Sequence, residues 1–277
     1  MKDEELFRTP VVVDSATALI QPGQRILCVG SCFAASIGKK FSDALFPAVV
    51  NPEGVMYNPV SVLHCVERLA ASDGAANASS PSFSPDVAIL TYGTNHVYIL
   101  KETNEVVDNC QKRPASLFRE EKLSVDECAH FMSRTIHCLR QMNPNVHVIA
   151  TVSPIRYHKY GFHGSQLSKA TLLLAVEKLG STVGYFPAYE IMNDELRDYR
   201  FYAADMLHPS DQAVDYIWRQ FVKNYFSTCA QQYLREWAPI AQALNHRPFN
   251  PDAPEYRTFQ AHTQQSLAQF RKKWLDA

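Results

Sequence analysis

The sequence has no hydrophobic run of the roughly 18 residues that a membrane-spanning helix needs. Its N-terminus, MKDEELFRTP, lacks the basic start and the apolar stretch of a secretory signal peptide. The formal net charge is −1, so the basic excess typical of nucleic-acid-binding proteins is missing too. We therefore expect a cytoplasmic protein whose partner is neither a membrane nor a nucleic acid.

The seven cysteines form no recognisable framework. Their number is odd and their spacing is irregular, which disfavours a set of disulfides and favours a reducing compartment. No Cys-x-x-Cys pair occurs, and the histidines show no compelling zinc-ligand spacing, so we expect no metal. Glycine-rich phosphate-binding loops are absent as well, and we expect no cofactor.

The chain is long enough to fold around its own core. Hydrophobic residues make up 46% and charged residues 20% of the 277 residues, which is ordinary for a globular protein. We expect one domain over residues 1–277, in which residues 229–277 form a helical extension packed on the rest. Residues 72–85 form the clearest predicted loop, because they are rich in Ser, Ala, Asn and Pro. Nothing in the sequence specifies an oligomeric state.

Short apolar runs alternate with longer helical patterns along the chain. The runs are rich in β-branched residues and end at turn residues, as parallel strands buried on both faces should; they are residues 25–30, 46–50, 86–92, 145–152 and 182–187. Helical spacing occurs at residues 34–45, 125–142, 165–179 and 210–226. This alternation predicts an α/β fold, a doubly wound parallel sheet of about five strands flanked by helices. Such sheets bind ligands at the carboxyl ends of their strands.

Ser31 follows the first predicted strand, and a helical pattern begins directly after it. A serine at this place either caps the helix through its hydroxyl or acts as a nucleophile whose oxyanion the helix N–H groups stabilise. The adjacent Cys32 suggests a cysteine hydrolase instead. Neighbouring side chains point in different directions, however, and a free cysteine usually packs as a small apolar residue. We favour Ser31 as the nucleophile.

Asp205 and His208 supply a candidate base, in the run Asp-Met-Leu-His-Pro-Ser. Histidine is the usual general base at neutral pH, and an aspartate three residues earlier can fold back onto its ring and fix the tautomer. Pro209 suits the first position of a following helix. The alternative is an ordinary turn with a surface histidine. A doubly wound sheet favours the catalytic interpretation, because it brings this turn and Ser31 to strand-to-helix edges.

The motif Gly-Ser-Cys-Phe-Ala at residues 30–34 resembles the signature of the GSCFA family, which is related to the SGNH/GDSL hydrolases. The resemblance covers about residues 29–221 and includes segments 51–59, 109–114, 152–156, 168–170, 185–190 and 198–202. It implies a flavodoxin-like sheet of the SGNH-hydrolase type and a serine hydrolase that acts on acyl esters. The implied substrate is a small-molecule or carbohydrate ester, and the implied reaction includes deacetylation.

The resemblance also implies roles for residues. In the wider SGNH group, Ser31, Asp205 and His208 match the catalytic triad. Gly54 matches a glycine whose N–H faces the oxyanion, and Asn95, in the run Gly-Thr-Asn, matches an oxyanion-binding amide.

GSCFA relatives often have Gly-Thr-Ala-Trp where this chain has Gly-Thr-Asn-His at residues 93–96. Asn58 and Asn109 are therefore alternative oxyanion donors or substrate contacts. Arg156 lies just beyond the fourth predicted strand, where its guanidinium would bind an anionic or hydroxyl-rich ligand or form a structural ion pair.

Two other functions remain open. The chain could be a non-catalytic binding module on the same fold, which an intact Ser, Asp and His set argues against. It could also hydrolyse thioesters or lipids, which a long apolar groove beside Ser31 would favour.

Overall fold

A computed structural model describes residues 9–14, 16, 19–74, 83–250 and 253–276. Its centre is a five-stranded sheet in which every neighbouring pair is parallel, in the order β2-β1-β3-β7-β8. These strands are β1 (Ile26–Gly30), β2 (Ala48–Val50), β3 (Val87–Tyr92), β7 (His147–Val152) and β8 (Gly184–Tyr185). Each lies inside one of the five predicted runs. The doubly wound, flavodoxin-like sheet is therefore confirmed.

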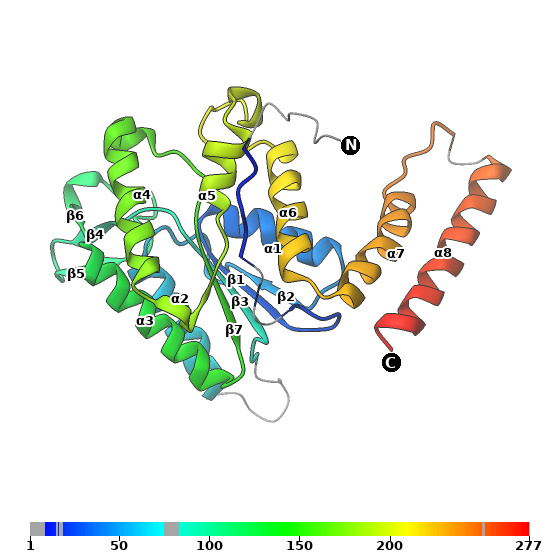
Figure 1. Ribbon diagram of the computed structural model, residues 1–277, viewed down its shortest axis with the longest axis horizontal. Helices are drawn as coiled ribbons and strands as arrows, with labels where there is room; N and C mark the ends of the chain where they lie inside the picture. Colours follow the sequence, from blue (N-terminus) through cyan, green and yellow to red (C-terminus); the bar gives the residue numbers. More distant parts are fainter. Residues whose placement is uncertain (1–8, 15, 17–18, 75–82, 251–252, 277) are drawn as a thin grey trace.

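Helices cover both faces of this sheet (Figure 1). One face packs against α1 (Cys32–Asp43) and α6 (Asp211–Tyr225), the other against α2 (Pro59–Gly74), α3 (Val125–Met142) and α4 (Gly161–Glu177). Alternate strand residues point to opposite faces of the sheet. Ile26 packs in the hydrophobic core on the side of α1 and α6, and Leu27 packs in the core on the side of α2, α3 and α4. This is why the strands read as continuous apolar runs.

A second, antiparallel sheet and helix α2 were not predicted. The sheet has the order β5-β4-β6, with strands β4 (His96–Leu100), β5 (Glu105–Val107) and β6 (Phe118–Lys122), preceded by the turn η1 (Ala115–Leu117). Four of the five residues of β6 are exposed, so the strand lacks an apolar pattern. Helix α2 continues into the predicted loop 72–85, of which residues 75–82 lie outside the described part of the chain.

Short helical turns connect the remaining elements. They are η2 (His158–Tyr160), η3 (Gly180–Thr182), α5 (Ala188–Glu190), η4 (Ile191–Leu196) and η5 (Tyr199–Phe201). No helix among the described residues has both the length and the apolar composition that would let it cross a bilayer.

The C-terminal segment forms α7 (Thr228–Leu244) and α8 (Pro254–Trp274), drawn in orange and red in Figure 1. The Tyr233 hydroxyl donates to the Ala44 carbonyl, and the Trp237 indole N–H to the Asp43 carbonyl, each at 2.7 Å. Both rings are buried in the core that α1 and α6 share. These contacts tie the C-terminal segment to the end of α1. A single domain over residues 1–277, with residues 229–277 as its extension, stays a prediction.

Candidate active site

Asp205 and His208 meet in the turn between η5 and α6. The His208 Nδ1 atom lies 2.6 Å from Asp205 Oδ2, and Asp205 Oδ1 accepts the backbone N–H groups of Leu207 and His208 at 2.9 and 3.0 Å. These backbone donors and the His208 ring lower the pKa of Asp205 to about 2. The carboxylate thus holds a proton on Nδ1 and leaves Nε2 free to accept one.

Ser31 is the N-cap of α1. Its side chain is fully buried, its Oγ accepts the Phe33 N–H at 3.2 Å, and the same Oγ lies 3.0 Å from the Thr91 hydroxyl. Within the described residues, no hydrogen bond joins Ser31 to His208. The structure therefore gives Ser31 the capping contact and leaves its role as nucleophile a prediction.

Gly30 makes this turn possible. It has a φ of 140°, and a Cβ atom there would lie 2.1 Å from the Thr91 carbonyl oxygen. Only a glycine allows β1 and β3 to approach so closely where they end. Because the strands approach so closely, Ser31 is buried at the sheet edge, whereas the next residue, Cys32, is partly exposed.

The two predicted oxyanion donors bond elsewhere in the fold. The Gly54 N–H donates to the Asn51 carbonyl at 2.8 Å, within a tight turn where Gly54 has a φ of 91°. The Asn95 amide donates to the Leu123 carbonyl at 2.7 Å. An oxyanion role for either residue stays a prediction. For Gly54 it would require the bond from its single N–H to break, whereas the Asn95 amide has a second N–H.

The predicted substrate-binding residues differ in their placement. Asn58 is buried, and its Oδ1 accepts the Ser61 N–H at 2.9 Å at the start of α2. Asn109 is exposed, and its Oδ1 accepts the Gln111 N–H at 2.8 Å. Arg156 lies beside the turn that holds Asp205 and His208, because its N–H donates to the Leu207 carbonyl at 3.0 Å. Its role in binding a substrate stays a prediction.

Two small cavities flank the segment that follows β7. The arginine pocket, of about 250 Å³, is polar and is lined by Arg156, Gln166, Asn193, Arg197, Tyr199 and Tyr202, among others. The tyrosine pocket, of about 200 Å³, is mostly apolar, and its lining includes Tyr57, Thr94, His96, Tyr98, Tyr157 and Tyr160. Arg156 lines the arginine pocket, and the next residue, Tyr157, lines the tyrosine pocket. The two pockets therefore adjoin the same stretch of backbone.

Lys169 is a buried residue whose place in the site the sequence did not reveal. Its Nζ donates to the carbonyls of Gly93 and Ser153, at 2.6 and 2.7 Å, and so ties together the segments that follow β3 and β7. Burial lowers the pKa of this amine to about 7. In the sequence, Lys169 was marked only by its place in residues 168–170, one of the segments that resemble the GSCFA family.

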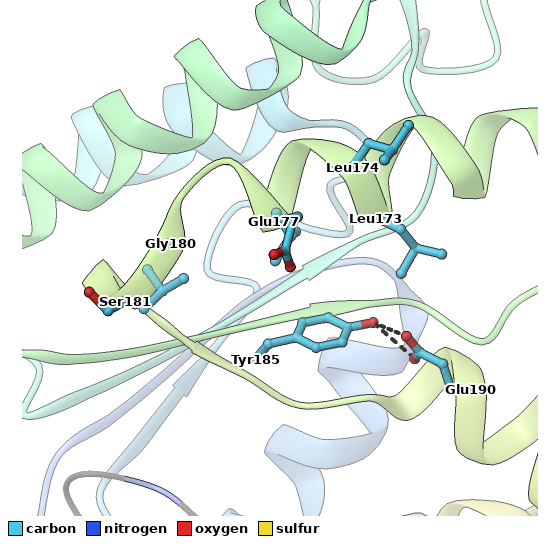
Figure 2. A pocket seen from close by; sticks show the side chains of 9 residues that line it. Leu173, Leu174, Glu177, Gly180, Ser181, Tyr185 and Glu190 are labelled. Atoms are coloured by element: carbon cyan, nitrogen blue, oxygen red, sulfur yellow. Dashed lines mark hydrogen bonds between the residues drawn. The ribbon is translucent and has the colours of Figure 1, made fainter. Parts of the chain in front are cut away.

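A larger cavity, of about 570 Å³, lies between α4 and β8 (Figure 2). Leu173 and Leu174 extend from the helix, and the Tyr185 hydroxyl donates to both oxygens of Glu190, at 2.7 and 2.9 Å. Burial raises the pKa of Glu190. None of the predicted site residues lines this cavity. In the described part of the chain, no three His, Cys, Asp or Glu side chains gather as metal ligands.

Several solved structures are similar to this chain. A Streptococcus pneumonia protein whose description refers to platelet activating factor has a TM-score of 0.46 and 13% identity, over 74% of this chain and 86% of its own. A family 3 carbohydrate esterase from Talaromyces cellulolyticus has a TM-score of 0.42 and 11% identity, over 76% and 99%. The family 3 carbohydrate esterase of Clostridium thermocellum has a TM-score of 0.40 and 15% identity, over 78% and 98%.

Sequence profiles decide the family. No curated protein matches the sequence. The profile of the GSCFA family matches residues 25–79 and 74–221, and that of the GSCFA domain protein, C-terminal domain, matches residues 237–277. These matches cover most of the chain, and the protein belongs to the GSCFA family.

Proposed function

We propose that this protein hydrolyses acyl esters by covalent catalysis at the sheet edge where β1 and β7 end. The observation that carries the proposal is the 2.6 Å contact between His208 Nδ1 and Asp205 Oδ2. A histidine whose tautomer is held by a carboxylate is the usual base for activating a hydroxyl or thiol. The N-terminus of α1, which offers Ser31 and Cys32, supplies the nucleophile.

The proposed reaction has two steps. His208 Nε2 takes the proton of the nucleophile as the nucleophile attacks the ester carbonyl carbon. The tetrahedral intermediate then expels the alcohol, which receives that proton from His208. In the second step His208 removes a proton from water, which attacks the acyl-enzyme and releases the acid. The positive end of the helix dipole at the start of α1 favours the negative charge on the oxygen in both steps.

The two pockets suggest a substrate with one polar and one small apolar part. The arginine pocket combines two guanidinium groups, two amides and tyrosine rings, which suit the hydroxyl groups and the flat face of a sugar. The tyrosine pocket, at about 200 Å³, is smaller than the ~300 Å³ of ordinary ligand pockets, and suits a short acyl group. The substrate class that we propose is a carbohydrate or similar polyol that carries a small acyl ester.

Turnover of p-nitrophenyl acetate by purified protein tests the activity, with acetylated sugars as a second panel. His208→Gln should lower turnover by about 10³-fold or more if His208 is the base. His130→Gln, on the exposed face of α3, is the matched control and should leave turnover unchanged. Equal turnover in the wild type and His208→Gln would refute the proposed base.

The burial of Ser31 favours one other function, a carbohydrate-binding module that performs no chemistry. Calorimetric titration with acetylated and unacetylated oligosaccharides separates the two. Binding of both forms, without acetate release and without an acyl adduct in the intact mass, would support the module.

A further inference from the structure

We infer that Cys32 is the nucleophile of this site and that the Tyr157 hydroxyl donates to the oxyanion. The inference rests on the proposed function and adds the identity of the attacking atom. A thioester, not an oxygen ester, is then the covalent intermediate.

The first argument is that Ser31 already has its partners. Its hydroxyl caps α1 and contacts Thr91, and its side chain has no exposed surface. Attack by its Oγ would remove the cap from the helix and break a buried contact. Cys32, one residue later, is the first residue of α1 and keeps part of its surface exposed.

The second argument is the setting of the Cys32 thiol. It lies at the N-terminus of a 12-residue helix, where the helix dipole favours negative charge. It also lies beside the hydroxyls of Tyr57 and Tyr157. Burial raises the pKa of both hydroxyls, and the nearby Cys32 raises each further. Both tyrosines also line the tyrosine pocket.

The third argument is an unused donor. The Tyr157 hydroxyl is buried and has no hydrogen-bond partner among the described residues. It occupies the space that Gly93 leaves, since a Cβ atom at Gly93 would lie 2.2 Å from the Tyr157 oxygen. A buried O–H without an acceptor is unfavourable, and an incoming oxyanion would supply that acceptor. Unlike the Gly54 N–H, which donates to the Asn51 carbonyl, this hydroxyl has no existing bond to break within the described part of the chain.

The base is anchored to the same segment. Arg156 directly precedes Tyr157, and its N–H donates to the Leu207 carbonyl, the residue before His208. The Arg156 guanidinium also donates to the Met206 carbonyl at 2.9 Å. The backbone that carries the oxyanion donor therefore also holds the turn that carries the base.

The step balances as written. The Cys32 S–H proton moves to His208 Nε2, the sulfur forms a bond to the ester carbonyl carbon, and the carbonyl electron pair moves to the oxygen that Tyr157 faces. The alcohol leaves with the proton from His208, and water then hydrolyses the thioester. No electron acceptor or donor is needed.

The test uses full-length protein in which Cys110, Cys138 and Cys229, the other cysteines with exposed surface, are changed to serine. It is mixed with p-nitrophenyl acetate and quenched in acid, and fragment ions locate the acetyl group within the tryptic peptide 26–39. We expect acetyl on Cys32, removed by neutral hydroxylamine, and none in Cys32→Ala. Tyr157→Phe should lower kcat by about 10²-fold, as loss of an oxyanion donor does. Acetyl on Ser31 that resists hydroxylamine would overturn the inference and leave the proposed function standing.

Alkylation by iodoacetamide covers the case in which no acetyl group forms. A second protein retains Cys32 and Cys229 and has serine at positions 110 and 138. At pH 7, Cys32 should react at least about ten-fold faster than the exposed Cys229, and His208→Gln should remove the difference. This result supports Cys32 even if aryl esters are not substrates. Equal rates, unaffected by His208→Gln, would overturn the inference, and with no ester turnover they would also count against the proposed function.

Discussion

The Ser31 hydroxyl lies 3.0 Å from the Thr91 hydroxyl, and the Ser31 backbone N–H donates to the same Thr91 oxygen at 2.9 Å. Both side chains are completely buried. This contact ties the first turn of α1 to the last residues of β3, and it fixes which side chain of the motif faces outward. The pair therefore has a structural role that a stability measurement can detect.

A double-mutant cycle on Ser31 and Thr91 tests that role. Thr91→Val keeps the shape and removes the hydroxyl, so Ser31 loses a buried partner, which should cost about 1–3 kcal/mol of unfolding free energy. Ser31→Ala removes the cap and should cost about 1 kcal/mol. The two changes together should cost less than their sum by at least about 0.5 kcal/mol, measured by urea unfolding. Strict additivity would show that the hydroxyls do not interact.

Asp205→Asn should remove most of the esterase activity while the fold is kept. An asparagine amide donates to Nδ1 instead of accepting from it, so the wrong ring nitrogen carries the proton, and turnover should fall by about 10³–10⁴-fold. The exposed Asp126→Asn, on α3, is the control. Circular dichroism checks the fold. Near-normal turnover in Asp205→Asn would remove this carboxylate from the mechanism.

The pH dependence of turnover follows from the same pair. The pKa of Asp205 is about 2, so this carboxylate stays ionised at every pH above about 4. Any loss of kcat/KM on acidification between pH 8 and pH 5 must then come from another group, and a histidine base loses activity when it is protonated. We expect activity to fall with decreasing pH in this window. A flat profile with chemistry rate-limiting would contradict a histidine base.

Lys169 should make the stability of the protein depend on pH. Burial lowers its pKa from 10.5 to about 7, so between these values the unfolded chain holds a proton that the folded protein has released. This group therefore adds stability as the pH rises from 7 towards 10, at about 1.4 kcal/mol per pH unit.

The difference in unfolding free energy between the wild type and Lys169→Met, measured in urea at pH 7, 8 and 9, isolates this contribution. It should grow with pH in favour of the wild type. Lys39→Met, at an exposed ion pair of α1, should show no such trend. A constant difference for Lys169→Met would mean that the amine is charged in both states.

Trp237→Ala tests whether the C-terminal helices share one cooperative unit with the sheet. The indole is buried, donates to the Asp43 carbonyl, and packs 5.2 Å from the Phe270 ring, so its loss should cost about 3–5 kcal/mol. Thermal unfolding followed by circular dichroism should show one transition at a lower midpoint. The control is Leu244→Ala, at an exposed position of α7. A separate low-temperature transition with an unchanged main midpoint would indicate an independent extension.

Elements whose signals are local were predictable from the sequence. The residues 125–142 predicted as helical are those of α3, whose start is marked by a capping box between Ser124 and Glu127. The strands β1, β3 and β7 are short apolar runs because both of their faces are buried. The edge strands β2 and β8 are only partly buried. Strand β6 escaped prediction because Phe118 is its one buried residue, so no alternation marks it.

The candidate site also has features that the sequence predicted and features that it did not. The sequence by itself determined the order of the main-sheet strands and the contact between Asp205 and His208, since the four residues of one turn suffice to form it. Only the tertiary structure distinguished the buried Ser31 from the partly exposed Cys32. Burial of Ser31 depends on Thr91, 60 residues further along the chain, and on a glycine that lets two strands close together. A contact between distant segments leaves no periodic pattern in either of them, so the exposed and the buried residue of this motif became distinguishable only after folding.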